Sequence, residues 1–179
     1  MITSTRAQVI FVLETRTLKI TQAQLINRFS VMDSHVVPAT GESRGLWLMW
    51  NDEVDMSIIR SSHHLILANG ICKPTNQNYK LVCIYGDTHH HRTAEIWEEV
   101  HNFVLASLDI PTFCMGDLNN IMHVNKKYGP GQANFNHIQK FCCLVKEYGL
   151  FYLGFSGPAY TWTNKVFLLT PLFKDSIVV

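Results

Sequence analysis

The sequence contains few charged residues and no excess of either sign. Only 16% of its 179 residues are charged, the formal net charge is +1, and 47% are hydrophobic. This balance excludes a disordered chain and predicts one globular domain with a substantial core. It gives no sign of a basic nucleic-acid surface, although one local groove can be basic on a neutral protein.

Cys-x-x-Cys motifs and long apolar runs are also missing. The five cysteines form no Cys-x-x-Cys pair, which argues against a zinc ribbon. Their odd number, with several inside apolar runs, indicates reduced core thiols in an intracellular protein. The N-terminus lacks a basic segment followed by an apolar one, so no secretory signal is visible. No run reaches the length of a membrane span, and we expect no membrane partner.

Short apolar runs predict a strand-rich first half of the chain. The expected strands cover residues 8–14, 45–50, 54–60, 64–72 and 79–85. A short helix is expected at 21–29, with Thr21 as its N-cap. The last two strands, joined by a loop at 73–78, predict an antiparallel meander.

The second half changes to helical spacing around one further strand, which begins at Pro111. A helix is expected from Arg92, and its apolar face comprises Ile96, Trp97, Val100, Val104 and Leu108. After a loop at 125–132, Asn134 begins another helix that Gly149 ends as a C-terminal cap. The apolar face of this helix comprises Phe135, Ile138, Cys142 and Val145. Strand, helix, strand, helix is typical of a βαβ arrangement, so we expect an α/β fold.

Polar side chains stand where three apolar strands end. Glu14 ends the first, Tyr85 ends the last strand of the meander, and Asp117 and Asn119 follow the run that starts at Pro111. In α/β folds ligands bind at the carboxyl ends of strands. If these strands are adjacent, their oxygen atoms converge into a set that suits Mg²⁺ and substrate phosphates. Metal-assisted hydrolysis of a phosphodiester is the reaction class that follows.

Each of these residues also has a plain structural interpretation. Asp117 and Asn119 favour Asx turns, Glu14 can pair with Arg16 at an exposed strand end, and Tyr85 can cap the core with its hydroxyl in water. Histidines at 63–64 and 89–91 raise the alternative of zinc. Neighbouring residues of an extended chain point to opposite faces, so we do not expect them to share one ion.

Five segments in order resemble the endonuclease domain of plant LINE-type (non-LTR) retrotransposons. This domain belongs to the endonuclease/exonuclease/phosphatase superfamily, which is similar to DNase I. The matching segments are Phe11–Arg16, Ser43–Trp50, Ile84–Gly86, Pro111–Asn120 and Gly154–Asn164. The resemblance implies a DNase I-like, two-sheet β-sandwich flanked by helices.

The resemblance also implies a role for each candidate residue. Glu14 is similar to the metal-binding glutamate and Tyr85 to the tyrosine that contacts the scissile phosphate. Asp117 resembles the aspartate that orients or deprotonates the attacking water, and it is also an implied metal ligand. Asn119 is similar to the hydrogen-bonding partner of that aspartate. DNA is the implied partner, in the nucleus. Mg²⁺, or Mn²⁺ in its place, is the implied cofactor, with no small-molecule cofactor.

Two features of the family have no counterpart in this sequence. Its first strand, with an Asn-x-x-Gly motif, would precede Met1, and no Arg-Leu-Asp-Arg or Ser-Asp-His segment follows Asn164. We therefore expect a partial domain over residues 1–164, lacking the first and last strands, and an unmatched tail at 165–179. Because general acid–base assistance contributes about 10²–10⁴-fold, we expect weak or no nuclease activity.

Two alternative functions remain at this point. The first is a catalytically dead remnant that serves as an interaction fold. The second is a phosphatase of the same superfamily, acting on phosphoinositides or nucleotides. The segment ending in Tyr160-Thr-Trp-Thr favours the retroelement branch over the phosphatases.

Overall fold

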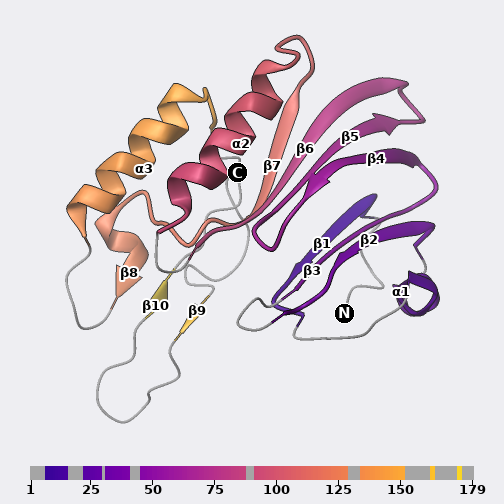
Figure 1. The fold of residues 1–179 in the computed structure, drawn as a ribbon, viewed down its shortest axis with the longest axis horizontal. Coiled ribbons are helices and arrows are strands. Elements are labelled where there is room, and N and C mark those ends of the chain that lie inside the picture. The colour runs from indigo at the N-terminus through magenta and orange to yellow at the C-terminus, as the bar shows by residue number, and fades with distance from the viewer. Residues whose placement is uncertain are drawn as a thin grey trace.

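Two β-sheets pack face to face, with helices on both outer faces (Figure 1). The structure, a computed structural model, describes residues 7–15, 22–29, 31–40, 45–87, 91–128, 134–151, 162–163 and 173–174. The expected two-sheet sandwich flanked by helices is confirmed.

The first sheet has three antiparallel strands in the order β1-β3-β2. They are β1 (Val9–Leu13), β2 (Asp33–Val37) and β3 (Leu46–Trp50). The central strand β3 is buried along its whole length. Leu46, Leu48 and Trp50 face the second sheet, while Trp47 and Met49 pack beneath α1 (Gln22–Phe29). Burial on both faces is the reason for its continuous apolar sequence.

The second sheet has four strands in the order β4-β5-β6-β7. They are β4 (Val54–Ser61), β5 (Leu65–Cys72), β6 (Gln77–Tyr85) and β7 (Thr112–Asp117). The first three form the expected antiparallel meander, and β7 joins β6 in parallel. The crossover between β6 and β7 is helix α2 (Thr93–Leu105), so the expected βαβ unit is confirmed.

Helices α2 and α3 (Phe135–Glu147) cover the outer face of the four-stranded sheet (Figure 1). The Trp97 ring of α2 lies 6.3 Å from the Phe141 ring of α3 and 5.4 Å from the Tyr148 ring, centroid to centroid. Asn134 caps α3 by accepting a hydrogen bond from the His137 N–H, and Gly149 ends it at φ +61°. The predicted start at Asn134 and the predicted C-terminal cap at Gly149 are confirmed.

One strand was missed, and two predictions about these elements were wrong in detail. Strand β2 was not expected, because its polar start shows no apolar run and its pairing with β3 creates it. Leu108 lies beyond the end of α2 and is 74% exposed. Phe135 is also exposed, whereas Phe141 is buried. The apolar face of α3 is therefore centred about one turn later than its first residues suggested.

A third, small sheet brings late parts of the chain together. Strands β8 (Lys127–Tyr128) and β9 (Trp162–Thr163) both pair antiparallel with β10 (Phe173–Lys174). A 3-10 helix at Val124–Lys126 precedes β8, where a loop was expected. Thr21 and the rest of the Gly154–Asn164 segment lie outside the described residues.

Burial explains the chemistry of the cysteines. All five are free thiols, and Cys83 and Cys114 are buried in the core. Burial raises the pKa of the Cys114 thiol to about 12 and raises that of Cys83 as well. These two cysteines are therefore core residues, as expected, and are held as unreactive thiols. Within the described part of the chain, no helix is long and apolar enough to cross a membrane.

Lys80 is a buried cation that caps the end of α2. Its Nζ donates hydrogen bonds to the carbonyl oxygens of Phe103, Val104 and Ser107, at 2.8–2.9 Å. The side chain is 3% exposed. Burial lowers the pKa of Lys80, and the charge of Asp109 acts in the opposite direction. One ammonium group thus donates to three carbonyls at a helix end, where intrahelical donors run out.

Replacing this cation should destabilise the fold. In Lys80→Met the aliphatic stem remains, but three carbonyl groups lose the Lys80 donor, and among the described residues only that of Val104 keeps a further bond, from the Ser107 N–H. The free energy of unfolding should therefore fall by about 2 kcal/mol or more. Urea unfolding followed by circular dichroism measures the change. The matched control is Lys73→Met, which removes an exposed ion pair with Asp55 and should change stability by less than about 1 kcal/mol. Equal losses in the two variants would contradict the capping role.

Candidate functional site

A hydrogen bond between the two sheets marks the candidate site. The Tyr85 hydroxyl, at the end of β6, donates to Oε1 of Glu14, which directly follows β1, at 2.8 Å. Tyr85 is 8% exposed and Glu14 is exposed. The phenol thus reaches from one sheet to the edge of the other and holds the carboxylate there. The alternative partner of Glu14, Arg16, lies outside the described residues.

Asp117 lies beside Tyr85, because β6 and β7 run parallel with these two residues in register. Two further bonds join the strand ends: the Gly86 N–H donates to the Asp117 carbonyl at 2.7 Å, and Asn119 Nδ2 donates to the Gly86 carbonyl at 2.6 Å. Strand β1 also contacts β7 across the sandwich. The structure therefore brings all four predicted residues to one rim: parallel pairing places Tyr85 beside Asp117, and the packing of the two sheets brings Glu14 to Tyr85.

Asp117 and Asn119 also form the Asx turn that was the plain alternative. The Asn119 N–H donates to Oδ1 of Asp117 at 2.8 Å. A carbonyl group only accepts hydrogen bonds, so the amide nitrogen of Asn119 must face Gly86 and its Oδ1 must point elsewhere. Within the part of the chain that the structure describes, Oδ2 of Asp117 has no hydrogen-bond donor. The turn therefore orients the pair and leaves one oxygen of each residue for another ligand.

Two of the site residues have an unusual backbone conformation. Glu14 has φ +54° and Asn119 has φ +50°, in the left-handed region. Asparagine visits this region readily, but a glutamate there is uncommon. Such a conformation costs on the order of 1–3 kcal/mol and is frequent at functional sites. At Glu14 this backbone conformation occurs where the carboxylate accepts the hydrogen bond of the Tyr85 hydroxyl.

Two glycines let the ends of β6 and β7 approach each other. A Cβ on Gly86 would overlap the backbone of Leu118, and a Cβ on Gly116 would overlap the carbonyl of Ile84. Gly116 also has φ +131°, which other residues rarely adopt. The glycine in each strand-ending motif is therefore required by close backbone contact.

The histidines at 63 and 64 lie near this rim but do not form a metal centre. The Nε2 atom of His63 is 3.1 Å from Oγ1 of Thr40, and Nδ1 of His64 is 3.0 Å from the carbonyl oxygen of Tyr85. Among the described residues no group of three or more His, Cys, Asp or Glu side chains could hold a metal ion. His91 is exposed just before α2, and His89 and His90 lie outside the described residues.

The contact between His64 and Tyr85 was missed at the level of sequence. The available signal was hairpin register: β5 and β6 are joined by a short turn, and Leu65 pairs with Ile84. One step further, His64 opposes Tyr85. Counting back from the turn would have placed the two residues together, although the contact of the ring with the carbonyl depends on the side-chain conformation.

The donor atoms at the rim fit a hard cation. Glu14 and Asp117 supply carboxylate oxygens, and Tyr85 and Asn119 supply a phenol and an amide oxygen. Mg²⁺ is usually bound through one or two carboxylates, several waters and substrate phosphates, so it does not need a larger protein cage. The residues present therefore fit Mg²⁺ better than zinc, which prefers nitrogen and sulfur ligands.

Comparison with known proteins places the fold. No family model and no curated protein sequence matches the chain. Among solved structures, the endonuclease domain of TRAS1, a telomere-specific non-LTR retrotransposon, is similar, with a TM-score of 0.64 and 11% identity. The match covers 96% of this chain and 84% of that domain. The chain therefore has the DNase I-like fold of that endonuclease domain.

Two further structures are more distant. The human Nocturnin catalytic domain has a TM-score of 0.48 and 15% identity, covering 93% of this chain and 69% of that one. Truncated TDP2 of Caenorhabditis elegans has a TM-score of 0.43 and 13% identity, covering 64% and 50%.

The close contact of β6 and β7 gives a test of how the rim is built. Gly116→Ala adds a Cβ against the Ile84 carbonyl and a strained φ, whereas Gly149→Ala adds strain alone, because nothing lies within 4 Å of its Cβ. Strain at the left-handed φ of Gly149 costs about 1–2 kcal/mol. Gly116→Ala should therefore lower the free energy of unfolding by at least about 2 kcal/mol more than Gly149→Ala does. Similar losses would show that the strands can separate at no extra cost.

Proposed function

We propose that this rim binds Mg²⁺, or Mn²⁺ in its place, and hydrolyses phosphodiester bonds of DNA. The observation that carries the proposal is the hydrogen bond of Tyr85 to Glu14, made where β6 lies beside Asp117. It holds the acidic end of β1 next to the strand end that carries Asp117, through a phenol that can also meet a phosphate. The DNase I-like fold supports the same reaction class.

Glu14 and Asp117 would hold the cation, and the Tyr85 hydroxyl keeps the Glu14 carboxylate in place. A bound divalent ion supplies charge stabilisation for the phosphate oxygens and polarises water. The Glu14 carboxylate is exposed, so a hydrated ion and a large substrate have access to it. The phenol hydroxyl is a donor that can also approach a phosphate oxygen at the same edge.

Asp117 is suited to take a proton from the attacking water. Its Oδ1 is held by the Asn119 N–H, and this bond fixes the direction of Oδ2. The amide of Asn119 is in turn anchored on the Gly86 carbonyl, so its own Oδ1 can accept a hydrogen bond from the same water. Positioning of this kind lowers the barrier by organising the reactants beforehand.

The proposed substrate class is DNA. The sequence motifs resemble those of plant LINE-type elements, and the TRAS1 domain comes from a non-LTR retrotransposon. Both support DNA as the substrate, in preference to phosphoinositides or nucleotides. A DNA substrate is consistent with a nuclear location of the protein.

A plasmid assay and a metal titration test the proposal separately. With Mg²⁺, the purified chain should convert supercoiled plasmid slowly to the nicked form, and Asp117→Asn should abolish this conversion. Glu14→Gln should weaken Mg²⁺ binding, followed by NMR, by at least about tenfold, because one of two carboxylate charges is lost.

The matched control is Glu53→Gln. Glu53 is also an exposed carboxylate near β1, but it bonds to Gln8 at the opposite end of the strand. This variant should bind Mg²⁺ as the unmodified protein does. Wild-type protein that neither binds Mg²⁺ nor nicks DNA would refute the function, and release of phosphate from nucleotides instead would indicate a phosphatase.

A further inference from the structure

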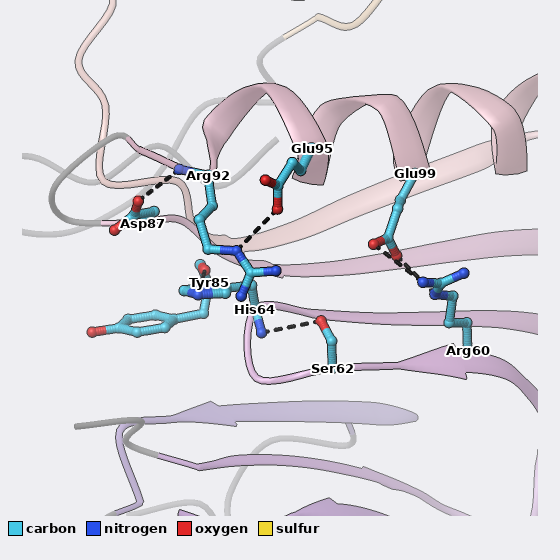
Figure 2. A network of polar contacts seen from close by, with 8 residues as sticks. All are labelled: Arg60, Ser62, His64, Tyr85, Asp87, Arg92, Glu95 and Glu99. Carbon is cyan, nitrogen blue, oxygen red and sulfur yellow. Dashed lines mark hydrogen bonds and ion pairs between the residues drawn. The ribbon is translucent and has the colours of Figure 1, made fainter. Parts of the chain in front are cut away.

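Tyr85 is held on both sides of its backbone by one residue, His64. The Tyr85 N–H donates to the His64 carbonyl at 2.8 Å, and the His64 ring atom Nδ1 lies 3.0 Å from the Tyr85 carbonyl oxygen. Figure 2 shows His64 against the Tyr85 backbone, while the phenol extends away from the Arg92–Glu95 pair of α2. One histidine therefore occupies both hydrogen-bonding groups of the candidate phosphate-binding residue.

The ring takes the place of a bond that an ordinary sheet would make. In an antiparallel ladder, a hydrogen-bonded pair exchanges two backbone bonds. Here the His64 N–H does not complete the exchange: it donates to Oγ of Ser62 at 3.3 Å. The side chain of His64 supplies the second bond to Tyr85 in its place. A residue without a side-chain donor would leave the Tyr85 carbonyl without this partner.

This contact defines the tautomer of the imidazole. A carbonyl oxygen only accepts hydrogen bonds, so Nδ1 of His64 must carry the proton. The ring is thereby fixed in one orientation. A bond of this type between a ring N–H and a backbone carbonyl commonly orients a histidine within a functional site.

The neighbouring peptide is held in the same manner. The Gly86 N–H and carbonyl bond to Asp117 and Asn119 respectively. All four polar backbone groups of Tyr85 and Gly86 thus have partners, and His64 supplies two of them. Tyr85 is the last residue of β6, so these backbone bonds hold its Cα at the strand end. The fixed backbone in turn sets the direction in which the phenol extends toward Glu14.

We propose that His64 is a positioning residue: its Nδ1–H fixes the Tyr85 backbone so that the phenol holds Glu14 and meets the substrate phosphate. The contact between His64 and Tyr85 is a matter of geometry. Its effect on metal and phosphate binding rests on the proposed function. His64 acts through Tyr85 and does not touch the reacting atoms. The adjacent His63, whose ring contacts Thr40, has no such role.

Two substitutions separate the donor from the bulk of the ring. In His64→Asn the amide nitrogen replaces Nδ1 and can still donate to the Tyr85 carbonyl, whereas His64→Leu fills the space without a donor. His64→Leu should weaken Mg²⁺ binding about tenfold, the lower end of the loss typical for residues that orient a ligand. His64→Asn should remain within about threefold of wild type, and the control His63→Leu should be unchanged.

A double-mutant cycle shows whether the effect passes through the phenol. In a Tyr85→Phe background, His64→Leu should change Mg²⁺ affinity less than about twofold, because the group that it positions is gone. An equal tenfold loss in both backgrounds would refute positioning. A lower melting temperature with unchanged affinity would also refute it, since that result describes a residue that only stabilises the fold.

NMR of the metal-free protein tests the contact without relying on the proposed function. Nitrogen shifts of labelled histidine should show His64 protonated at Nδ1, and the Tyr85 ring signals should move in His64→Leu but not in His64→Asn. A proton on Nε2 alone, or unmoved Tyr85 signals, would overturn the proposal. If these results hold while wild type binds no Mg²⁺, the proposed function fails and the positioning contact stands.

Discussion

The candidate site depends on one hydrogen bond between the two sheets, from the Tyr85 hydroxyl to the Glu14 carboxylate. The sandwich core brings β1 and β6 together through apolar contacts, which have little directional preference. The phenol adds direction, because its hydroxyl leaves the core at the strand end and meets a carboxylate outside it. Packing therefore sets the distance between the sheets, and this bond selects which side chains meet at their edge.

The acid–amide pair depends on a second constraint, the close approach of β6 and β7. Gly86 and Gly116 have no room for a Cβ. Because the strands touch there, backbone bonds from Gly86 reach Asp117 and Asn119. The Asx turn then holds the Asp117 carboxylate by a main-chain donor. The plain interpretation of this turn and the functional one describe the same geometry, since the turn is what aims the pair.

The predictable parts of the fold were those in which burial leaves a local signal. Strand β3 is apolar throughout because both of its faces are covered, and the end of α3 was marked by a glycine at positive φ. Strand β2 left no such signal, because it forms by pairing with β3 and its first residues are polar. Phe135 and Leu108 matched helical spacing but are exposed, since spacing alone does not say where a helix meets its neighbour.

The sequence by itself determined that carboxylates, a phenol and an amide stand at the ends of apolar strands, because strand ends are set by short-range changes in hydropathy and turn chemistry. Only the tertiary structure decided that Tyr85 meets Glu14 and that His64 holds Tyr85. These contacts join residues far apart in the chain, and they arise from sheet register and from the packing of one sheet on the other. Neither sheet register nor sheet packing can be predicted from any single segment of the sequence.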